Sequence, residues 1–359
     1  MCNYTVDPDG DVILKLEYPN DPFAPEGGGT PARTQKPNSN ALAKGDSSLN
    51  TSSSQVIAKP KEADTTEPVT FRVSSRHLIL ASPVFKSALT RGWKESVKTK
   101  GEFRISSQGW DATALGIFLN AIHCQYKQVP RLLELEMLAK VAVIVDYYAA
   151  NQAMEILGPI WINELRSSLP TTTCHNRTIA LWICVSWVFG DESAFEDATK
   201  VAIHHGYSNM TDFGLPIPGW VIEHINRDRK LQINRIFEGL IRLQSDLLDD
   251  RKGCGIECRT MQLGALTRLL SNTSLLNYFL EKPEDYQALS VSQLLQELGV
   301  AVCPTWYSRS SKVTINDFKH KVTYHRHECC APGNAFCVAI QSITQEVNQC
   351  LLGLSIKSY

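Results

Sequence analysis

Cysteine and histidine side chains in the C-terminal third of the chain have types and spacings that could bind a metal ion. Cys254 and Cys258 are four residues apart, so a helix would place both thiols on one face. In the later segment YHRHECC, alternate residues include His327 and Cys329, which would share one face of an extended segment. Thiolates and imidazoles are the usual ligands of tetrahedral zinc. The sequence therefore suggests a structural zinc site of Cys254, Cys258, His327 and Cys329, which would order the C-terminal region 301–359.

The competing interpretation is that these cysteines and histidines are scattered residues that bind no metal. A spacing of C-x3-C is less diagnostic of zinc than C-x2-C, and a long stretch of chain separates the two groups. The chain contains 11 cysteines, an odd number spread over its length, which is unlike the disulfide framework of a small secreted protein. Most of these thiols are expected to be reduced and buried, and the sequence leaves both interpretations open.

Motifs that carry catalysis or bind nucleotides do not occur in the sequence. There is no G-x-S-x-G nucleophile elbow, no G-x-x-x-x-G-K-[ST] phosphate loop and no G-x-G-x-x-G turn. Three consecutive glycines, Gly27–Gly29, lie in polar sequence without a flanking helix, which is typical of a linker. We therefore expect no enzymatic activity, no catalytic residues and no cofactor other than the zinc considered above.

The basic stretch RDRK, Arg227–Lys230, is the candidate for nucleic-acid binding. It lies on a predicted long amphipathic helix, where such charges usually form a solvated face, and Asp228 and Glu238 offset part of its charge. The formal net charge of the chain is −1, so no bulk field attracts a nucleic acid or an anionic membrane. We therefore expect protein partners and no nucleic-acid partner.

The N-terminal sequence and the hydropathy pattern indicate in which cellular compartment the protein is expected. The opening MCNYTVDPDGDVIL has neither the basic region nor the apolar run of a signal peptide. The most apolar run, Ile179–Gly190, has about half of the ~20 residues that a membrane-spanning helix requires, so it is interpreted as a buried helix. We expect a protein of the cytoplasm or nucleus that is not secreted and does not bind a membrane.

Two short alternating segments are predicted to pair as strands of one small sheet. Asp11–Leu16 and Val69–Val73 alternate in the way that half-buried strands do. Residues 19–68 between them are rich in Pro, Gly, Ser, Thr and Asn, which predicts a disordered insertion. Lengthening a loop from ~5 to ~50 residues costs only about 2 kcal/mol in closure entropy, so the sheet can tolerate the insertion. The insertion is either a regulatory or docking segment with phosphorylation sites or a loop under little constraint.

Helix-start signals follow the second of these strands. Ser74 or Ser75 is predicted to cap a short helix that runs through Leu80, and Ser82-Pro83 is predicted to begin another. The periodicity predicts a further strand at Glu102–Ser107 and helices at Asp111–Cys124, Glu134–Tyr148, Asn151–Arg166 with a break or kink at Gly158-Pro159, Thr178–Phe189, Ala194–His205, LPIPGW to about Leu248, Met261–Leu270 and Val291–Leu298.

This order of elements resembles the BTB/POZ domain, in the variant common in filamentous-fungal proteins. The family pattern is roughly an Asp-containing strand, then F-x-V-H, a leucine on the first helix and S-P-x-F. Here FRVSSRHLILASPVF follows it, with Ser74 in the place of the histidine. The matching residues are Asp11, Phe71, Val73, Leu80, Ser82, Pro83 and Phe85. All of them except Pro83 are interpreted as fold-defining and not as a site. The later segments KVAVIVDYYAA, PIWINELR, LWICVSWVFG, GLPIPGWVIEHIN and CRTMQLGALTR resemble the helical tails of those fungal proteins.

The resemblance implies an α+β fold in which a BTB/POZ-like small sheet is capped by helices and followed by an all-α C-terminal domain. The expected organisation is a BTB/POZ domain at 1–18 and 69–166, the insertion at 19–68, a helical domain at 167–300 and a C-terminal region at 301–359.

The resemblance also implies a non-catalytic protein–protein interaction adaptor or scaffold, which could serve as a substrate adaptor for a cullin ubiquitin ligase. The implied partners are a cullin or regulatory proteins, and a homodimer is a further expected assembly because BTB domains form dimers. The alternative function is a nuclear transcriptional co-regulator that uses the BTB domain for its interactions.

Overall fold

The structure is a computed structural model that describes residues 3–26, 67–99, 101–172, 175–249, 251–252, 255–272, 275–281, 286–300, 307–310, 323–326 and 335–356. The chain divides into two compact units, which are described separately. The N-terminal unit consists of Met1–Leu169, Ala180–Ala194 and Asp212–Ile217, and the C-terminal unit consists of Pro170–Ile179, Phe195–Thr211 and Pro218–Tyr359. The predicted domain boundaries at 166 and 300 stay a prediction. Two segments beyond residue 166, Ala180–Ala194 and Asp212–Ile217, make most of their contacts with the N-terminal unit.

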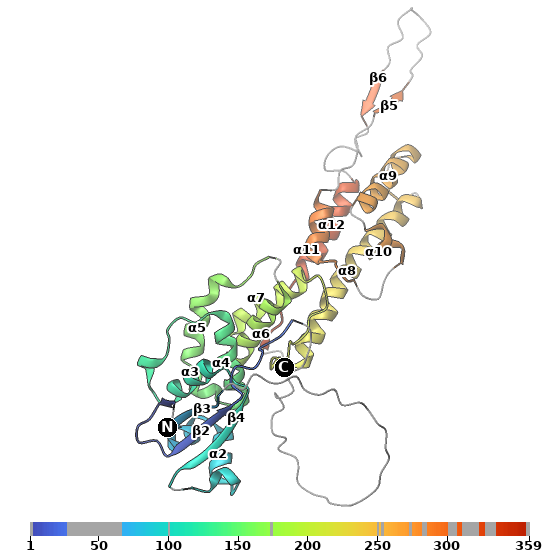
Figure 1. Cartoon of the computed structure of the whole chain (residues 1–359). Helices are drawn as coiled ribbons and strands as arrows, with labels where there is room; N and C mark the ends of the chain where they lie inside the picture. Colours follow the sequence, from blue (N-terminus) through green and yellow to red (C-terminus); the bar gives the residue numbers. More distant parts are fainter. Residues whose placement is uncertain are drawn as a thin grey trace, which may run out of the picture. The chain divides into compact units, whose positions relative to one another are not determined.

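The N-terminal unit contains a four-stranded mixed sheet with the order β1-β3-β2-β4 (Figure 1). The strands are β1 (Tyr4–Thr5), β2 (Val12–Glu17), β3 (Val69–Val73) and β4 (Phe103–Gln108). Strand β2 pairs antiparallel with β3 and parallel with β4, so it is flanked on both sides. The predicted pairing of the two segments on either side of the insertion is therefore confirmed, whereas the short β1, which pairs parallel with β3, was not predicted.

The register of β2 against β3 explains why these short segments form strands. Val12 lies opposite Val73 and Leu14 opposite Phe71, and these four side chains are buried. Alternation of buried and half-buried residues along β2 puts one apolar face of the sheet against the helices. A slip of one residue would turn the apolar set toward solvent, so the pattern fixes the register.

Two short helices follow β3 with different kinds of N-terminal cap. Helix α2 (Pro83–Thr90) begins as predicted, because Ser82 Oγ accepts a hydrogen bond from the Phe85 N–H at 3.1 Å. Helix α1 (Ser75–Ala81) differs from the prediction, since neither Ser74 nor Ser75 caps it with its own hydroxyl. Instead, Asp11 accepts from the Ser75 N–H at 2.9 Å and from Ser75 Oγ at 3.0 Å.

One of the residues interpreted as fold-defining is not in the core. Leu80 is 88% exposed, so its assignment as fold-defining is wrong, and Leu78, two residues earlier on α1, is fully buried instead. The helix periodicity explains the difference, because residues 78 and 80 point to different faces of α1. Phe71 and Phe85 are buried as expected.

The helices α3 (Ala112–Ile122) and α4 (Leu135–Tyr147) supply much of the remaining core of the N-terminal unit and contact each other. Seven residues of each are buried, which confirms the interpretation of α4 as a helix packed between layers. The predicted helix 151–166 is interrupted, but not at Gly158-Pro159 as expected. The interruption lies at 155–156, between the 3-10 turn η3 (Asn151–Met154) and α5 (Leu157–Leu165), whose first turn contains Gly158 and Pro159. A proline in the first turn of a helix costs no hydrogen bond, because the N–H groups there have no partner within the helix. Helix α5 is followed by a second turn, η4 (Arg166–Ser168). Two further 3-10 turns are η1 (Lys94–Ser96) and η2 (Tyr126–Gln128).

The start of the segment predicted as disordered packs against the N-terminal unit. Residues 19–26 are described, Ala24 is buried, and the Asn20 N–H donates to the Trp110 carbonyl at 2.9 Å. The ordered part of the chain therefore extends beyond the predicted boundary at residue 18. Residues 27–66 lie outside the described residues, so the disorder predicted there stays a prediction.

Helices α6 (Asn176–Phe189) and α7 (Glu192–His205) contribute residues to both units, and the rest of the C-terminal unit is mainly helical. Its other helices are α8 (Gly219–Leu248), α9 (Ile256–Asn272), α10 (Leu276–Glu281), α11 (Val291–Gly299) and α12 (Ala335–Gln349). The predicted cap of α11 is confirmed, because Ser290 Oγ accepts from the Gln293 N–H at 3.2 Å. Helices α10 and α12 and the antiparallel pair β5 (Tyr307–Ser310) and β6 (Thr323–Arg326) were not predicted.

The α+β class is thus observed, with a small mixed sheet and a mostly helical remainder. Among the described residues, the helices are too short or too polar to traverse a lipid bilayer.

Asp11 caps α1 from a distant part of the sequence, so its replacement should change the stability of the N-terminal unit. Replacing Asp11 with alanine removes the acceptor of two Ser75 hydrogen bonds, so we expect the free energy of unfolding to fall by about 1–2 kcal/mol. Asp9→Ala is the matched control, because Asp9 is an exposed acid two residues earlier. Chemical denaturation of both variants measures the difference, and equal stability of the two variants would contradict the cap.

Candidate functional site

The structure describes one of the four residues of the suggested zinc site. Cys258 lies on α9, is fully buried and accepts a hydrogen bond from Gln262 Nε2 at 3.2 Å. Cys254, His327 and Cys329 lie outside the described residues. Within the part of the chain that is described, no three His, Cys, Asp or Glu side chains are grouped closely enough to hold a metal ion. The zinc hypothesis therefore stays a prediction.

The most buried histidine of the N-terminal unit has a structural role in its hydrogen bonds. His123 Nε2 accepts from the Ser74 N–H at 3.0 Å, and Nδ1 lies 2.8 Å from the Leu119 carbonyl. These partners require the neutral ring with its proton on Nδ1. Because backbone groups occupy both nitrogens, the ring is not available as a general base for a neighbouring hydroxyl.

The electrostatic surroundings of His123 also favour the neutral ring. Burial lowers the pKa of His123, and the ring of His77, whose centroid is 4.8 Å away, lowers it further. The hydrogen bond to the Leu119 carbonyl and the carboxylate of Asp7 raise the pKa, but they do not outweigh the effect of burial and of His77. Protonation would also remove the acceptor of the Ser74 N–H at the start of α1.

The basic stretch Arg227–Lys230 is not the uniformly solvated face that the sequence predicts. Arg229 is only 2% exposed, and its guanidinium donates to the carbonyls of Gly206, Tyr286 and Leu289. The expectation is wrong for this residue, because the planar guanidinium can satisfy several carbonyls inside the unit at once. Arg227 and Lys230 are exposed.

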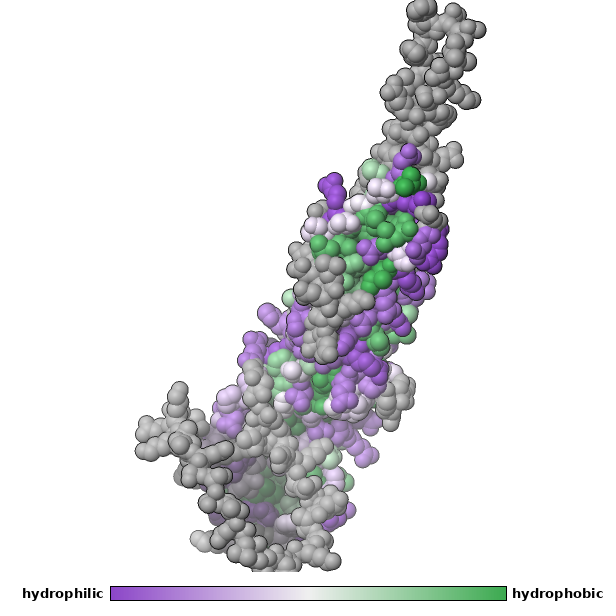
Figure 2. All heavy atoms as spheres, turned by 90° about the vertical axis from the view of Figure 1, so that its right-hand side faces the viewer, coloured by the Kyte–Doolittle hydropathy of each residue, from purple (hydrophilic) through white to green (hydrophobic). Residues whose placement is uncertain are grey.

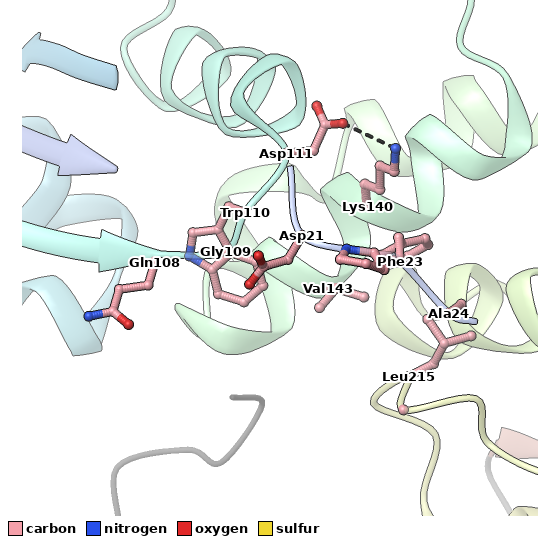
Figure 3. Close-up of a pocket in the computed structure, with 12 residues that line it drawn as sticks. Asp21, Phe23, Ala24, Gln108, Gly109, Trp110, Asp111, Lys140, Val143 and Leu215 are labelled. Atoms are coloured by element: carbon pink, nitrogen blue, oxygen red, sulfur yellow. Dashed lines mark hydrogen bonds and ion pairs between the residues drawn. The ribbon is translucent and has the colours of Figure 1, made fainter. Parts of the chain in front are cut away.

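A pocket in the N-terminal unit lies where β4 ends and α3 begins (Figure 3). Its volume is about 80 Å³, and it is formed by the segment after β2, the turn after β4, one face of α4 and the loop at 214–215. The twelve lining residues are Asp21, Pro22, Phe23, Ala24, Gln108, Gly109, Trp110, Asp111, Lys140, Val143, Gly214 and Leu215.

The walls of this pocket are held by backbone hydrogen bonds. The Gly109 N–H donates to the Glu17 carbonyl at 3.0 Å, the Asn20 N–H donates to the Trp110 carbonyl at 2.9 Å, and Asn20 Oδ1 accepts from the Ala112 N–H at 3.1 Å. Gly109 has a φ of +77°, and a Cβ atom there would lie 2.6 Å from a carboxylate oxygen of Asp21. Glycine at this position thus allows Asp21 to pack against the end of β4.

Two residues of the lining, Asp111 and Lys140, form an ion pair (Figure 3). Lys140 Nζ is 3.1 Å from a carboxylate oxygen of Asp111 and 3.4 Å from one of Glu136. Partial burial lowers the pKa of Lys140, but the bonds to Asp111 and Glu136 outweigh that effect and hold the pKa above its ordinary value. The ammonium therefore stays charged, and it also lies 5.8 Å from the centre of the Phe23 ring.

Sequence reasoning found none of the pocket residues as a site. Asp111 is the first residue of the predicted helix Asp111–Cys124. In the structure it is the N-cap of α3, and its side chain accepts from the Thr113 and Ala114 N–H groups, a cap that was not predicted. Phe23 lies inside the segment predicted as disordered, and Lys140 lies within the predicted helix Glu134–Tyr148. No local motif connects these residues, because four separate stretches of chain supply the pocket.

Exposed apolar side chains mark a second feature of the N-terminal unit. Leu80 on α1 is 88% exposed, and Trp93 and Val97, on either side of η1, are 61% and 64% exposed. Helix α2 contacts α1, which carries Leu80, and it also contacts η1, which Trp93 and Val97 flank. We call Leu80, Trp93 and Val97 the apolar surface. Figure 2 also shows patches of hydrophobic residues, in green, on the surface of its upper part, bordered by hydrophilic residues.

Arg229 provides a stability test within the C-terminal unit. Arg229→Met keeps much of the side-chain volume but leaves three carbonyls without their donor, so we expect a loss of about 2–4 kcal/mol in the free energy of unfolding. Amide hydrogen exchange at 288–291 should accelerate in this variant. Arg227→Met, at an exposed arginine paired with Asp228, should cost less than about 0.5 kcal/mol. Similar losses for both variants would rule out the buried role.

His123 provides a pH test. Its folded-state pKa lies below the ordinary value near 6.5, so its contribution to stability is complete above about pH 6.5 and decreases as the pH falls toward the folded-state pKa. Between about pH 6.5 and 5, we expect the stability of His123→Gln to fall less than that of the unchanged chain, because glutamine has no ring to protonate. Denaturation midpoints measured across this range provide the comparison. Identical pH profiles would exclude the effect.

Comparisons of the chain with protein-family models, with curated proteins and with solved structures found no match. The functional inferences that follow therefore depend on the residues, their geometry and the resemblance described above.

Proposed function

We propose that this chain is a non-catalytic adaptor or scaffold of the BTB/POZ type, in which the N-terminal unit binds one protein and the helical C-terminal unit positions or recognises another. The observation that carries the proposal is the strand–helix–helix unit β3-α1-α2, placed beside β2 by antiparallel pairing across the long insertion. This arrangement is the one expected from the resemblance of FRVSSRHLILASPVF to that family.

The apolar surface supports a role in protein binding. Leu80 and Trp93 are large, and burying such side chains against a partner stabilises a complex by removing apolar area from water. The high exposure of Leu80 means that core packing does not explain the presence of a leucine there. A position that resembles the family pattern but does not contribute to the core is more readily explained by binding than by folding.

The hydrogen bonds of the histidines provide a second line of support for a non-catalytic role. His123 uses both ring nitrogens on backbone groups, and His224 Nδ1 lies 2.7 Å from the Trp220 carbonyl of its own helix. These rings are held as parts of the fold. We therefore propose interaction, and not chemistry on a substrate, as the activity of the chain.

The partner class decides between the two forms of the proposal. A cullin scaffold recovered with the tagged full chain, and identified by mass spectrometry, would support an adaptor of a cullin ubiquitin ligase. Chromatin-associated regulatory proteins would support the alternative, a nuclear transcriptional co-regulator. Recovery of neither class, together with a catalytic turnover in the purified chain, would overturn the proposal.

Substitutions in the apolar surface test the proposed binding. The double variant Leu80→Asp with Trp93→Ser should fold like the unchanged chain, because both side chains are exposed, but it should recover the partner about tenfold less well. Leu132→Asp is the matched control at a 69% exposed leucine outside this surface. Quantitative mass spectrometry of the three preparations measures recovery. Equal recovery by the double variant and the control would show that the apolar surface is not the binding site.

A further inference from the structure

We propose that residues 69–104 bind an acidic segment of a partner protein, whose own apolar side chains contact the apolar surface of Leu80, Trp93 and Val97. This inference rests on the proposed function, because it names the chemistry of the partner that the N-terminal unit would bind. Residues 69–104 comprise β3, α1, α2, η1 and the start of β4.

Positive charge is concentrated in this stretch of the chain. It contains eight Lys or Arg and two Glu, a formal charge of +6, whereas the whole chain carries −1. The remaining residues therefore carry −7, the difference between −1 and +6. Exposed charges attract ligands of opposite sign over about a Debye length, which is ~8 Å at physiological ionic strength. The charge of residues 69–104 thus favours an anionic ligand.

Two acids pair with bases of this stretch as part of the fold. Glu102 Oε1 lies 2.8 Å from Arg72 Nη2, and Asp11 Oδ2 lies 3.3 Å from Lys98 Nζ. Lys98 Nζ also lies 4.6 Å from the centre of the Phe103 ring. These contacts join β3 and the residues after η1 to the ends of neighbouring strands. The positive charge that remains is carried by other side chains.

Four further bases are exposed and, within the part of the chain that the structure describes, form no ion pair. We call them the free bases, and they are Arg76, Lys86, Arg91 and Arg104. Glu95, which forms no ion pair among these residues either, offsets one of the four charges. Exposed charges of this kind contribute little to folding. Their charge is therefore available to a partner, and their replacement should leave the fold intact.

The elements that carry the free bases also carry the apolar surface. Arg76 and Leu80 are four residues apart on α1, so they lie on one face of that helix. Arg91 ends α2, and Trp93 follows two residues later. Helix α2 contacts α1 and η1, and η1 contacts β4, which carries Arg104. Basic and apolar side chains are thus interspersed along one series of contacting elements.

This mixture of side chains favours an acidic polypeptide over a nucleic acid or a membrane. Proteins that bind single-stranded nucleic acids stack aromatic side chains on the bases, and the aliphatic Leu80 and Val97 cannot do so. A helix that lies on a membrane presents one continuous apolar face, whereas these side chains come from α1 and from the two sides of η1. A polypeptide can place carboxylates opposite the free bases and apolar side chains opposite Leu80 and Val97.

The test measures the fluorescence anisotropy of labelled peptides that are titrated with the full chain. The acidic peptide EELFEELFEE is compared with KKLFKKLFKK, which reverses its charge, and with EEGSEEGSEE, which lacks its apolar side chains. We expect the acidic apolar peptide to bind at least about tenfold more tightly than either of the others. Its affinity should fall about tenfold between about 0.05 and about 0.5 M NaCl, because salt screens exposed charges.

Charge reversal at two of the free bases tests the location. Arg76→Glu with Arg91→Glu should weaken binding of the acidic apolar peptide by at least about tenfold, and Arg76→Gln with Arg91→Gln should weaken it by less. Lys127→Glu with Arg131→Glu is the matched control, because it changes the net charge equally at exposed bases of the N-terminal unit outside residues 69–104. The control should leave the affinity within about twofold. Thermal melting verifies that each variant folds.

Three results would each overturn the inference. They are equal binding of the three peptides, no saturable binding of the acidic apolar peptide, and equal losses in the charge-reversal variant and its control. Duplex DNA, or vesicles of phosphatidylserine and phosphatidylcholine, serve as further probes at about 0.15 M NaCl. Tighter binding of either than of the acidic apolar peptide would also overturn it, because these residues would then recognise another class of partner.

The outcome is separable from that of the proposed function. If proteins are recovered equally well by the Arg76→Glu, Arg91→Glu variant and by its control, the inference fails and the adaptor function stands. Failure of the proposed function is seen instead as catalytic turnover without recovery of a protein partner, which is measured independently of peptide binding.

Discussion

Strand β2 is the element on which the rest of the N-terminal unit depends. It is buried on one face and hydrogen-bonded on both edges, antiparallel to β3 and parallel to β4. Asp11, directly before the strand, fixes the start of α1 through Ser75. The chain that leaves the other end of the strand forms one wall of the pocket. One register therefore positions a helix start at one end and a pocket at the other.

The beginning of α1 is held by side chains that are distant in sequence. The Ser74 N–H donates to His123 from the end of α3, and the Ser75 N–H donates to Asp11 from the sheet. A helix of seven residues is too short to be stable by its own propensity, so it depends on such tertiary partners. Both acceptors are titratable, which makes the anchoring of this helix, and of the exposed Leu80 that it carries, sensitive to acid.

The C-terminal unit uses one buried arginine in a comparable way. Arg229 on α8 connects the end of α7 with the segment that precedes α11, through carbonyls of Gly206 and Leu289 among others. Burying a guanidinium is costly unless its donors are satisfied, and these carbonyls satisfy several of them. The same basic stretch therefore contains one residue that maintains the fold and others that face solvent.

The sequence by itself determined the local elements, because strand alternation, serine caps and helix periodicity depend on neighbouring residues. It predicted the pairing of β2 with β3, the cap of α2, the end of α8 and the cap of α11. Tertiary structure alone decided the cap of α1, the burial of Arg229, the exposure of Leu80 and the pocket formed by Asp21, Trp110 and Lys140. Each of these depends on side chains that meet only after the strands pair and the helices pack, and a contact between distant stretches leaves no periodic pattern in either one.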